Sequence, residues 1–376
     1  MQDLRTDVLV TCGGGLQGMT VYKSLRVFKS LMTHLFDSNQ ENVSKYFFEH
    51  FFHSSLVRQE KRYEEELFGY CKLHDIRLVI PATQFDLLFL SRRKQEFEKR
   101  LNCRIAVPDE VHVKVFLDKV ASRRFLKEKG FPVQELADPL SRNHYPLIGK
   151  PLDGWGGKGV VVLKDIDGLQ QFHGKREDYI WTGYIKDFKE YSIDFSVDHR
   201  GQISVPIARE RLMISGGIAL VSKRFDLPEA YASRIAQSFS DPAFSGIYNL
   251  QYISCSEGDF FTDLNPRIGT SAVIGSRTAA NPVGHLLGLS NKFPHSDGVS
   301  KVIRYLDELH LPVDNDQIDQ LQEPSSSRLP AHERSRDEVI KNRNKEIARK
   351  MMEEGLPLDQ IVRITGLSEK VIESSL

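Results

Sequence analysis

Two oxygen-bearing side chains stand two residues apart near the end of an apolar run. The run reads FFTDLNPRIGT from Phe260 to Thr270, and it contains Asp263 and Asn265. In a β-strand, residues i and i+2 point to the same face, so these side chains would present their oxygens side by side. Mg²⁺ takes one or two such protein oxygens and completes its shell with water and substrate phosphates. The pattern predicts either a magnesium site or a strand end whose polar residues meet water.

Lysines and a glycine-rich loop precede this pair in the chain. Lys119 lies near the start of a predicted helix, Lys150 ends a predicted strand, and WGGKG follows at 155–159. Lysines neutralise phosphates, and the N–H groups of a glycine loop approach phosphate oxygens closely because no Cβ intervenes. With Asp263 and Asn265, these features predict an enzyme that handles a nucleoside triphosphate. Taken singly, each lysine is better explained as a solvated side chain.

Two arginines alternate on another predicted strand, IARERLMISGG, where Arg209 and Arg211 share a face. A guanidinium group matches a carboxylate in a bidentate way, so the pair predicts a clamp for a substrate carboxylate. The same pattern is also that of a charged strand edge that prevents further pairing. The SGG that follows favours the clamp, and Arg277 is a further candidate for the same task.

The N-terminal part of the chain has the pattern of a parallel βαβ unit. A short apolar run over 7–11 is typical of a buried strand, and a tight turn of glycines follows it. Val21, Leu25 and Phe28 then recur at helical spacing. A second helix–strand step follows, with a buried strand over 76–80. This order is that of a Rossmann-like unit.

The glycine turn of this unit has two explanations. A dinucleotide site needs an acid at the end of the next strand. The segment SNQENVSKYFFEHFF at 38–52 is not a clean strand. The turn is therefore either a phosphate loop or a connection that only packs a strand against a helix.

The middle of the chain has the pattern of antiparallel hairpins. It predicts a helix over 116–130, a hairpin with a long glycine-rich loop at 145–165, a hairpin around 257–259, and a closing helix with small residues. Residues 311–336 gather Asp, Gln, Ser and Pro without apolar periodicity, which predicts a linker. Residues 337–376 have a helical pattern throughout.

Composition narrows the class of protein. The 376 residues suffice for two or three domains, and 40% hydrophobic and 27% charged residues are ordinary for a globular protein. The 51 basic and 51 acidic residues cancel, so bulk charge suggests no polyanionic partner. Four scattered cysteines form no CxxC pair, which favours a reducing compartment. There is no apolar run of membrane-spanning length and no signal-peptide pattern, so we expect a cytoplasmic protein without a membrane partner.

The order of the segments resembles the ATP-grasp superfamily, in particular the carbamoyl phosphate synthase-like carboxylate–amine ligases. The resemblance covers roughly residues 5–290 and is most specific in FTDLNPR, followed by GKPLDGWGGKG and LDKVASRRFLKEKG. It implies a Rossmann-like pre-ATP-grasp domain over 1–115, which helps to bind substrate, and a two-lobed ATP-grasp domain over 116–310. The expected fold class is therefore α/β and α+β, with a small helical module after the linker.

The resemblance assigns nucleotide contacts to single residues. Lys119 and Lys150 would contact ATP phosphates, and Glu190 in FKEYSID would hold the ribose hydroxyls. Backbone groups of Tyr184 and Ile185 would hold adenine, although the hinge strand YIWTGYIKD lacks the glutamate that the family usually carries there. The lid over the phosphates would consist of Gly156, Gly157, Lys158 and Gly159. Glu190 is also explained as a plain surface acid on a strand edge, and Lys158 as a residue that keeps its loop solvated.

The metal and the transferred phosphoryl group have their own candidates. Gln251, Asp263 and Asn265 match the positions that bind Mg²⁺ (or Mn²⁺) in the family, with Asp263 in place of the commoner glutamate. Gln251 is as readily explained as an ordinary strand residue. Arg267 matches an arginine that faces the phosphoryl group, and we expect Arg267, Arg209 and Lys150 to act in catalysis.

The function expected from this resemblance is an ATP- and Mg²⁺-dependent ligase. It would phosphorylate a small-molecule carboxylate to an acyl phosphate, which an amine converts to an amide, with release of ADP. The alternatives are a kinase on the same scaffold and a non-catalytic nucleotide-binding regulator. A homodimer is compatible with the family.

The tail KMMEEGLPLDQIVRITGLSEKVI resembles a helix-turn-helix module of transposase-like bacterial proteins. From residue 331 to residue 376 it carries nine Lys or Arg and nine Asp or Glu residues, so the tail is neutral. A nucleic-acid reader is usually basic on one face. We therefore expect packing or protein contact from this module, and no nucleic-acid partner.

Overall fold

The N-terminal residues build a five-stranded parallel sheet in the order β3-β2-β1-β4-β5. Its strands are β1 (Thr6–Thr11), β2 (Leu31–Asp37), β3 (His50–His53), β4 (Leu78–Pro81) and β5 (Arg104–Ile105). The helices that connect them are α1 (Leu16–Leu25), α2 (Glu60–Leu73) and α3 (Leu87–Leu101). Both faces of the sheet are covered by apolar clusters, as a parallel sheet requires. The predicted Rossmann-like unit is confirmed.

This structure, a computed structural model, describes most of the first 305 residues. The described residues are 6–154, 157–294, 298–305, 309, 358 and 371–372. Contacts divide the chain into one unit over Met1–His310 and another over Leu311–Leu376. The predicted linker and, apart from three residues, the predicted helical module lie outside the described residues.

The strand after the glycine turn is β2, which precedes the segment 38–52 in which we looked for it. The expectation that no clean strand follows the turn is therefore wrong. Thr33 and His34 interrupt the apolar pattern of β2, yet both are buried, because this strand is covered on both faces. Asp37 ends β2, and its carboxylate accepts hydrogen bonds from the N–H of Gly14 at 2.7 Å and of Asn39 at 2.8 Å. Asp37 therefore stabilises the glycine turn by accepting a hydrogen bond from its backbone.

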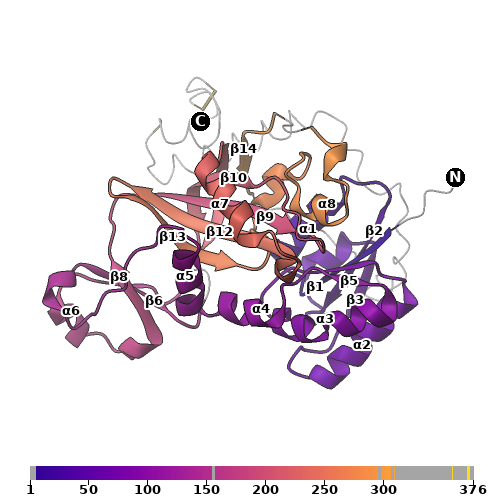
Figure 1. Cartoon of the computed structure of the whole chain (residues 1–376), viewed down its shortest axis with the longest axis horizontal. Helices are drawn as coiled ribbons and strands as arrows, with labels where there is room; N and C mark the ends of the chain where they lie inside the picture. The colour runs from indigo at the N-terminus through magenta and orange to yellow at the C-terminus, as the bar shows by residue number, and fades with distance from the viewer. Residues whose placement is uncertain are drawn as a thin grey trace. The chain divides into compact units, whose positions relative to one another are not determined.

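The middle of the chain forms two antiparallel sheets. The larger has six strands in the order β13-β12-β9-β10-β11-β14, and the smaller has three in the order β7-β6-β8. The larger consists of β9 (Lys189–Val197), β10 (Ile207–Ser215), β11 (Ile218–Phe225), β12 (Gly246–Cys255), β13 (Gly258–Asn265) and β14 (Lys301–Ile303). The smaller consists of β6 (Leu147–Pro151), β7 (Val161–Leu163) and β8 (Tyr179–Gly183). In Figure 1 the small sheet and the parallel sheet lie at opposite ends of the six-stranded sheet.

The predicted hairpins are confirmed. β6 pairs with β7 across a long connection, and β12 pairs with β13 around Glu257. The helix expected over 116–130 is two helices, α4 (Glu110–Leu117) and α5 (Lys119–Glu128), separated by Asp118, whose side chain caps α5. The predicted domain boundary at 115/116 falls inside α4.

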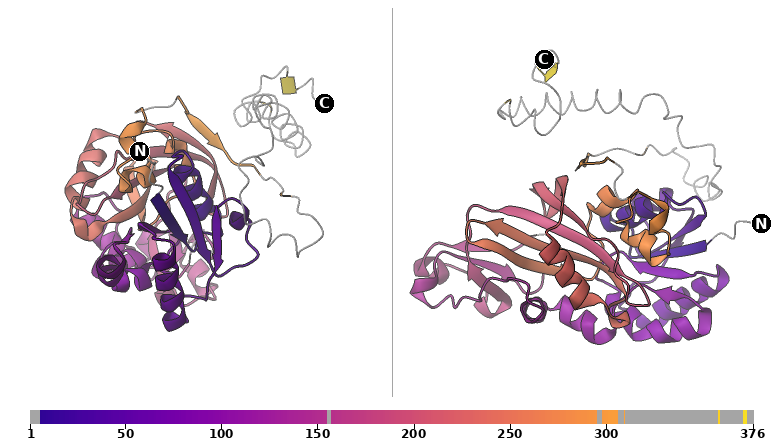
Figure 2. Two further views of the ribbon diagram at one scale, coloured as in Figure 1. Left: turned by 90° about the vertical axis from the view of Figure 1, so that its right-hand side faces the viewer. Right: turned by 45° about the horizontal axis from the view of Figure 1, so that its top comes forward.

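One face of the six-stranded sheet is packed by helices. Side chains of α4, α5 and α7 (Glu229–Phe239) form an apolar cluster with this sheet, and α7 lies against the strands in Figure 2. Ile193, Leu250 and Leu264 come from three neighbouring strands and are all at most 3% exposed. Because side chains alternate along a strand, the residues beside these three point to the opposite face.

The segment after β13 packs against the parallel sheet. Thr20 of α1 donates to the carbonyl of Thr270 at 2.7 Å, and Asn281 donates to the carbonyl of Ser24 at 2.9 Å. The single closing helix that we expected is wrong: a short 3₁₀ turn at Ala272–Gly275 is followed by α8 at Pro282–Leu286. Asn281 caps α8 and proline begins it, since proline cannot continue an earlier helix.

Among the described residues, no helix combines the length and the apolar character needed to cross a membrane.

A short helix, α6 (Ile166–Gln170), follows strand β7 of the smaller sheet.

Candidate functional site

A row of polar side chains covers the face of the six-stranded sheet opposite the apolar cluster. Gln251 of β12 pairs with Asp263 of β13, and Asn249 pairs with Asn265. Directly opposed residues of an antiparallel pair share a face. On the other side of β12, strand β9 adds three side chains by the same alternation. We call this set the polar face; it consists of Glu190, Ser192, Asp194, Asn249, Gln251, Asp263 and Asn265.

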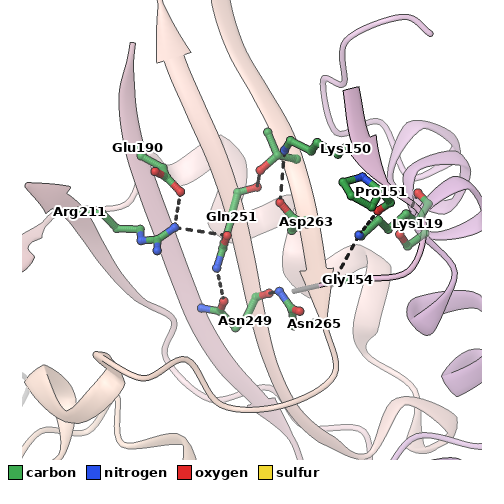
Figure 3. A network of polar contacts seen from close by, with 12 residues as sticks. Lys119, Lys150, Pro151, Gly154, Glu190, Arg211, Asn249, Gln251, Asp263 and Asn265 are labelled. Carbon is green, nitrogen blue, oxygen red and sulfur yellow. Dashed lines mark hydrogen bonds and ion pairs between the residues drawn. The ribbon is translucent and has the colours of Figure 1, made fainter. Parts of the chain in front are cut away.

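The two predicted lysines meet the polar face at Asp263. The Nζ of Lys150, near the end of β6, lies 3.8 Å from an Oδ of Asp263. Lys119 begins α5, and its Nζ donates to the carbonyl of Pro151 and, at 3.1 Å, to that of Gly154. Figure 3 shows Lys150 pointing toward Asp263, with Lys119 beyond it. The structure thus brings together residues that are 144 positions apart in the chain (from Lys119 to Asp263).

Electrostatics keep Asp263 ionised. Burial alone would raise the pKa of this carboxyl, but Lys150, a hydrogen bond from Thr262 and Lys119 hold it below its ordinary value. Burial lowers the pKa of Lys119, which Asp263 partly opposes. A carboxylate that stays ionised beside two cations suits a site for a divalent ion with phosphates.

A recess lies between the small sheet, α5 and β13. Its lining residues come from all three parts: Lys119, Arg123, Gln134, Lys150, Ile180, Thr182, Thr262 and Asp263. Three of them are cationic and one is a carboxylate, so the titratable lining carries a net charge of two positive units. The recess therefore favours an anionic ligand.

Arg211 occupies the other end of the polar face. Its guanidinium forms an ion pair with Glu190, lies 3.5 Å from the Oε1 of Gln251, and donates to the carbonyl of Gly217 at 2.7 Å (Figure 3). Burial raises the pKa of Glu190, and Arg211 opposes that shift. Glu190 is therefore a half-buried acid facing the site.

Arg209 lies in the interior. Its guanidinium forms an ion pair with Asp194, and their side chains are 1% and 0% exposed. Asp194 also accepts from Asn249 at 3.2 Å and from the N–H of Gly269 at 2.6 Å, while Arg209 donates to Ser271 at 2.7 Å. The charged-edge alternative is wrong because β10 pairs with a strand on each side. Arg209 is therefore enclosed with Asp194, whereas Arg211 pairs with Glu190 on the polar face.

Arg267 stands next to Asn265 at the end of β13. One of its guanidinium nitrogens lies 3.5 Å from the Oδ1 of Asn265, and another donates to the carbonyl of Ile268 at 3.0 Å. The buried Asp194–Arg209 pair holds Gly269 and Ser271 just beyond. It therefore fixes the turn that carries Arg267. Arg277, the further candidate, is exposed and lies outside the strands of the polar face.

The groups available for a metal ion are one carboxylate and amide oxygens. No cluster of three or more His, Cys, Asp or Glu that suits a metal is found in the described part of the chain. The Oε1 of Gln251 faces Arg211, and its Nε2 donates to Asn249 at 2.9 Å. Asp263 is thus the carboxylate donor that fits Mg²⁺, an ion that takes few protein ligands when phosphates supply the others. The amide oxygens of Asn265 and Gln251 are the further candidates, and each lies 3.5 Å from an arginine nitrogen.

The predicted lid is described from Gly157 onward, and Gly156 lies outside the described residues. Gly157 and Gly159 have φ of +74° and +73°, in the left-handed region that favours glycine. Lys158 between them is exposed. Glycine therefore stands at the two positions of this loop where the backbone adopts the left-handed conformation.

The hinge after β8 already makes backbone contacts. The Nε2 of Gln134 donates to the carbonyl of Gly183 at 2.9 Å, and the N–H of Tyr184 donates to the carbonyl of Pro146 at 2.9 Å. The N–H of Tyr184 is thus engaged, and among the two predicted hinge residues we favour Ile185 as the base contact.

Sequence reasoning missed four residues that contribute to the site. Asn249 and Asp194 were visible as polar residues at even spacing from Gln251 and Glu190. Arg123 was visible four residues after Lys119, on the same helical face. Gln134 had no signal in the sequence, since only the fold brings it to the hinge.

Comparisons with known proteins agree with this geometry. Residues 116–271 match the family model described as ATP-grasp domain. Residues 341–374 match the model described as the C-terminal HTH domain of the Rpn/YhgA-like nuclease family. No curated protein matches the chain by sequence.

Solved structures share the fold at low sequence identity. N5-carboxyaminoimidazole synthetase from Staphylococcus aureus, complexed with ADP, has a TM-score of 0.60 and 15% identity, over 81% of this chain and 82% of that one. The biotin carboxylase domain of 2-oxoglutarate carboxylase from Hydrogenobacter thermophilus, in complex with MgADP, ADP and bicarbonate, has a TM-score of 0.59 and 14% identity, over 77% and 70%. The corresponding synthetase from Thermotoga maritima has a TM-score of 0.54 and 15% identity, over 77% and 76%. The chain has the ATP-grasp fold, as predicted.

Proposed function

We propose that this chain, which contains an ATP-grasp domain, is an ATP- and Mg²⁺-dependent carboxylate–amine ligase. The observation that carries the proposal is the meeting of Lys150, Lys119 and Asp263 at one recess, with Glu190 and Asn265 on the adjoining polar face. Cations, an ionised oxygen ligand and a ribose acceptor are what a triphosphate needs. The ADP-bound structures of the same fold support the choice of nucleotide.

The proposed reaction has two displacements. A carboxylate oxygen of the substrate attacks the γ-phosphorus of ATP, the bond to the β-phosphate oxygen breaks, and ADP leaves. The amine nitrogen then attacks the acyl carbon, the bond to the phosphate oxygen breaks, and inorganic phosphate leaves as the nitrogen loses a proton. The product is an amide-like bond.

The residues of the chain act by positioning and by charge. Lys150 and Lys119 neutralise phosphate oxygens, and Glu190 orients the ribose. Arg267, held by the turn at Gly269, faces the phosphoryl group, and Arg211 receives the substrate carboxylate. When bound between Asp263 and Asn265, Mg²⁺ would stabilise charge on the phosphates. A closing lid over 156–159 would exclude water from the acyl phosphate.

The test is ADP release from the full chain with panels of carboxylates and amines. A ligase releases ADP only when carboxylate, amine and Mg²⁺ are all present, and mass detection identifies the coupled product. ADP release with a single acceptor would instead indicate a kinase. If no panel gives release and MgATP does not bind, the proposal is wrong.

The helix-turn-helix match supports one rival function, a nucleotide-binding regulator. Such a protein would bind ATP with negligible turnover and shift the mobility of DNA. We favour the ligase because the predicted tail is neutral, and a mobility-shift assay with and without MgATP separates the two functions.

A further inference from the structure

We propose that Arg123 is a third phosphate-binding cation of the recess, beside Lys119 and Lys150. The proposal rests on the proposed function, since it concerns the same nucleotide. No sequence motif or resemblance assigned a role to this residue. Three features of Arg123 support this role: a buried donor without an acceptor among the described residues, its position on α5, and the charge of the recess that it lines.

The first observation is an unsatisfied hydrogen-bond donor. The Nη2 atom of Arg123 is buried and has no hydrogen-bond partner among the residues that the structure describes. A buried donor without an acceptor is costly, and the cost is greater for a charged group. Arg123 also lines the recess, so a bound ligand is the natural source of the missing acceptor.

The acid that would otherwise pair with Arg123 is engaged elsewhere. Glu135 is the acid that most favours the charged form of Arg123, but its carboxylate accepts from Lys127 at 2.6 Å at the surface. Asp263 has Lys150 as its nearest cation. Among the described residues no ion pair with Arg123 is formed. Glu135 and Asp263 act on Arg123 only at longer range than an ion pair.

The position of Arg123 matches that of the two lysines. It follows Lys119 by four residues within α5, so both side chains lie on one face of the helix, about 6 Å apart at their Cβ atoms. Thr182 and Ile180 line the facing side of the recess from β8. A chain of phosphates that meets Lys119 is therefore within reach of Arg123.

The charge of the recess identifies the class of ligand. Its two net positive units match the roughly two negative charges of a nucleoside triphosphate with one Mg²⁺ at neutral pH. Without Arg123 the recess would carry only one. A neutral nucleobase would leave this charge unbalanced, so we assign Arg123 to the phosphates rather than to the base.

The experiment compares Arg123→Gln in the full chain with Arg124→Gln. Arg124 is the next residue of the same helix and is exposed, so it controls for loss of a positive charge from α5. Calorimetry with adenosine, AMP, MgADP and MgATP gives the affinity of each protein. We expect Arg123→Gln to weaken MgATP binding on the order of ten- to a hundred-fold, as for a hydrogen bond to a charged group, and to leave adenosine binding within about two-fold. Arg124→Gln should stay within about two-fold for all four ligands.

Further variants and conditions guard against a merely structural effect. Arg123→Lys keeps the charge but not the planar fork, so it should recover part of the lost MgATP affinity. The loss in Arg123→Gln should also shrink at high salt, since part of the attraction is screened. If Arg123→Gln fails to fold, Arg123→Lys is compared with wild type, and an unchanged MgATP affinity in it would overturn the proposal.

Two results overturn the inference. One is an equal loss for adenosine and MgATP, which would place Arg123 at the base or the ribose. The other is wild-type MgATP affinity in Arg123→Gln. Failure of the proposed function looks different: the wild-type chain itself would bind no Mg-nucleotide, or would bind MgATP without the ADP release that requires both carboxylate and amine.

Discussion

Two charged clusters lie on the same six-stranded sheet and its surroundings, and they differ in how completely their polar groups are satisfied. The Asp194–Arg209 pair is 0% and 1% exposed and is surrounded by partners from Asn249, Gly269 and Ser271. The recess holds a pair at 3.8 Å, Lys150 and Asp263, whose side chains are about one-third exposed (35% and 34%). It also contains the Nη2 of Arg123, a buried donor without an acceptor among the described residues.

This difference separates a structural role from a binding role. In the buried pair every charge has found its partner within the fold, so nothing is left for a ligand to bind. In the recess the cations exceed the carboxylate, so an entering anion would offset part of the free energy that their burial costs. Unsaturated charge in a recess is thus a better sign of a site than charge alone. Arg211, which pairs with Glu190, differs from Arg209 in its place on the polar face rather than in unsatisfied charge.

The largest effect on stability is expected from a substitution in the buried Asp194–Arg209 pair. Arg209→Met leaves the carboxylate of Asp194 buried without its cation, so the free energy of unfolding should fall by about 3–5 kcal/mol. Chemical denaturation monitored by circular dichroism measures this. Asp194→Asn combined with Arg209→Met removes both charges and should recover part of the loss. Unchanged stability in Arg209→Met would show that the pair does not hold the sheet.

The next effect concerns the recess. Asp263→Asn removes the only carboxylate of its lining while keeping the volume, so turnover should fall on the order of 10²–10³-fold. The free energy of unfolding should change by less than about 1 kcal/mol, because the partner Lys150 is partly exposed. Glu257→Gln, an exposed carboxylate at the turn of the same hairpin, is the matched control and should keep full turnover. Retained activity in Asp263→Asn would count against the metal assignment.

A smaller effect is expected from pH, because the two acids of the site are shifted in opposite directions. The pKa of Glu190 is raised by burial, whereas that of Asp263 is held below its ordinary value by Lys150 against the effect of burial. As pH falls, Glu190 takes its proton first, above the ordinary value of about 4.3, and its ribose contact weakens while Asp263 is still ionised. MgATP affinity should therefore decline on the acid side before Asp263 titrates.

Glu190→Gln provides the check of this pH dependence. The variant should bind MgATP on the order of ten-fold more weakly at pH 7, and the acid-side decline should move to lower pH.

The ionised forms of Asp263 and Glu190 contribute to the free energy of unfolding with opposite signs. The contribution of Asp263 is present above its unfolded pKa and is lost as pH falls through its folded pKa, whereas ionised Glu190 lowers stability above its raised pKa. An acid-side decline that stays in place in Glu190→Gln would assign it to another group.

The smallest effect on stability is expected from an ion pair that is exposed at the surface. Lys127 and Glu135 form an ion pair at 2.6 Å, but their side chains are 58% and 78% exposed. Lys127→Ala should change the free energy of unfolding by only about 0–1 kcal/mol. If Lys127→Ala lowered the free energy of unfolding as much as Arg209→Met, burial would not be what makes the Asp194–Arg209 pair more important for stability than an exposed ion pair.

Much of the fold follows from local pattern. The strand and helix of 6–25 and the hairpins at β6–β7 and β12–β13 were predicted, because strong periodicity and glycine turns act over short distances. β2 was missed, since polar Thr33 and His34 hide a strand that is buried on both faces. The broken closing helix was missed because Asn281 and Pro282 start a new helix inside a continuous run of small residues.

The candidate site was only partly visible from the sequence. The spacing of Asp263 and Asn265 placed both on one face, and that required nothing beyond the alternation of a strand. The same alternation placed Arg209 and Arg211 together but gave no measure of depth. Burial depends on what packs above each position, and here the segment at 269–271 covers Arg209 while Arg211 stays at the site.

The sequence by itself determined which residue types are available and which of them share a strand or helix face, because these follow from periods of 2 and 3.6 residues. The tertiary structure decided which of those side chains meet. It brought Lys119, Lys150 and Asp263 to one recess and enclosed Arg209 with Asp194. Within the described part of the chain, it left the Nη2 of Arg123 without an acceptor. Charge pairing and desolvation act through space between distant segments, so only the packed chain specifies which cations remain for a ligand.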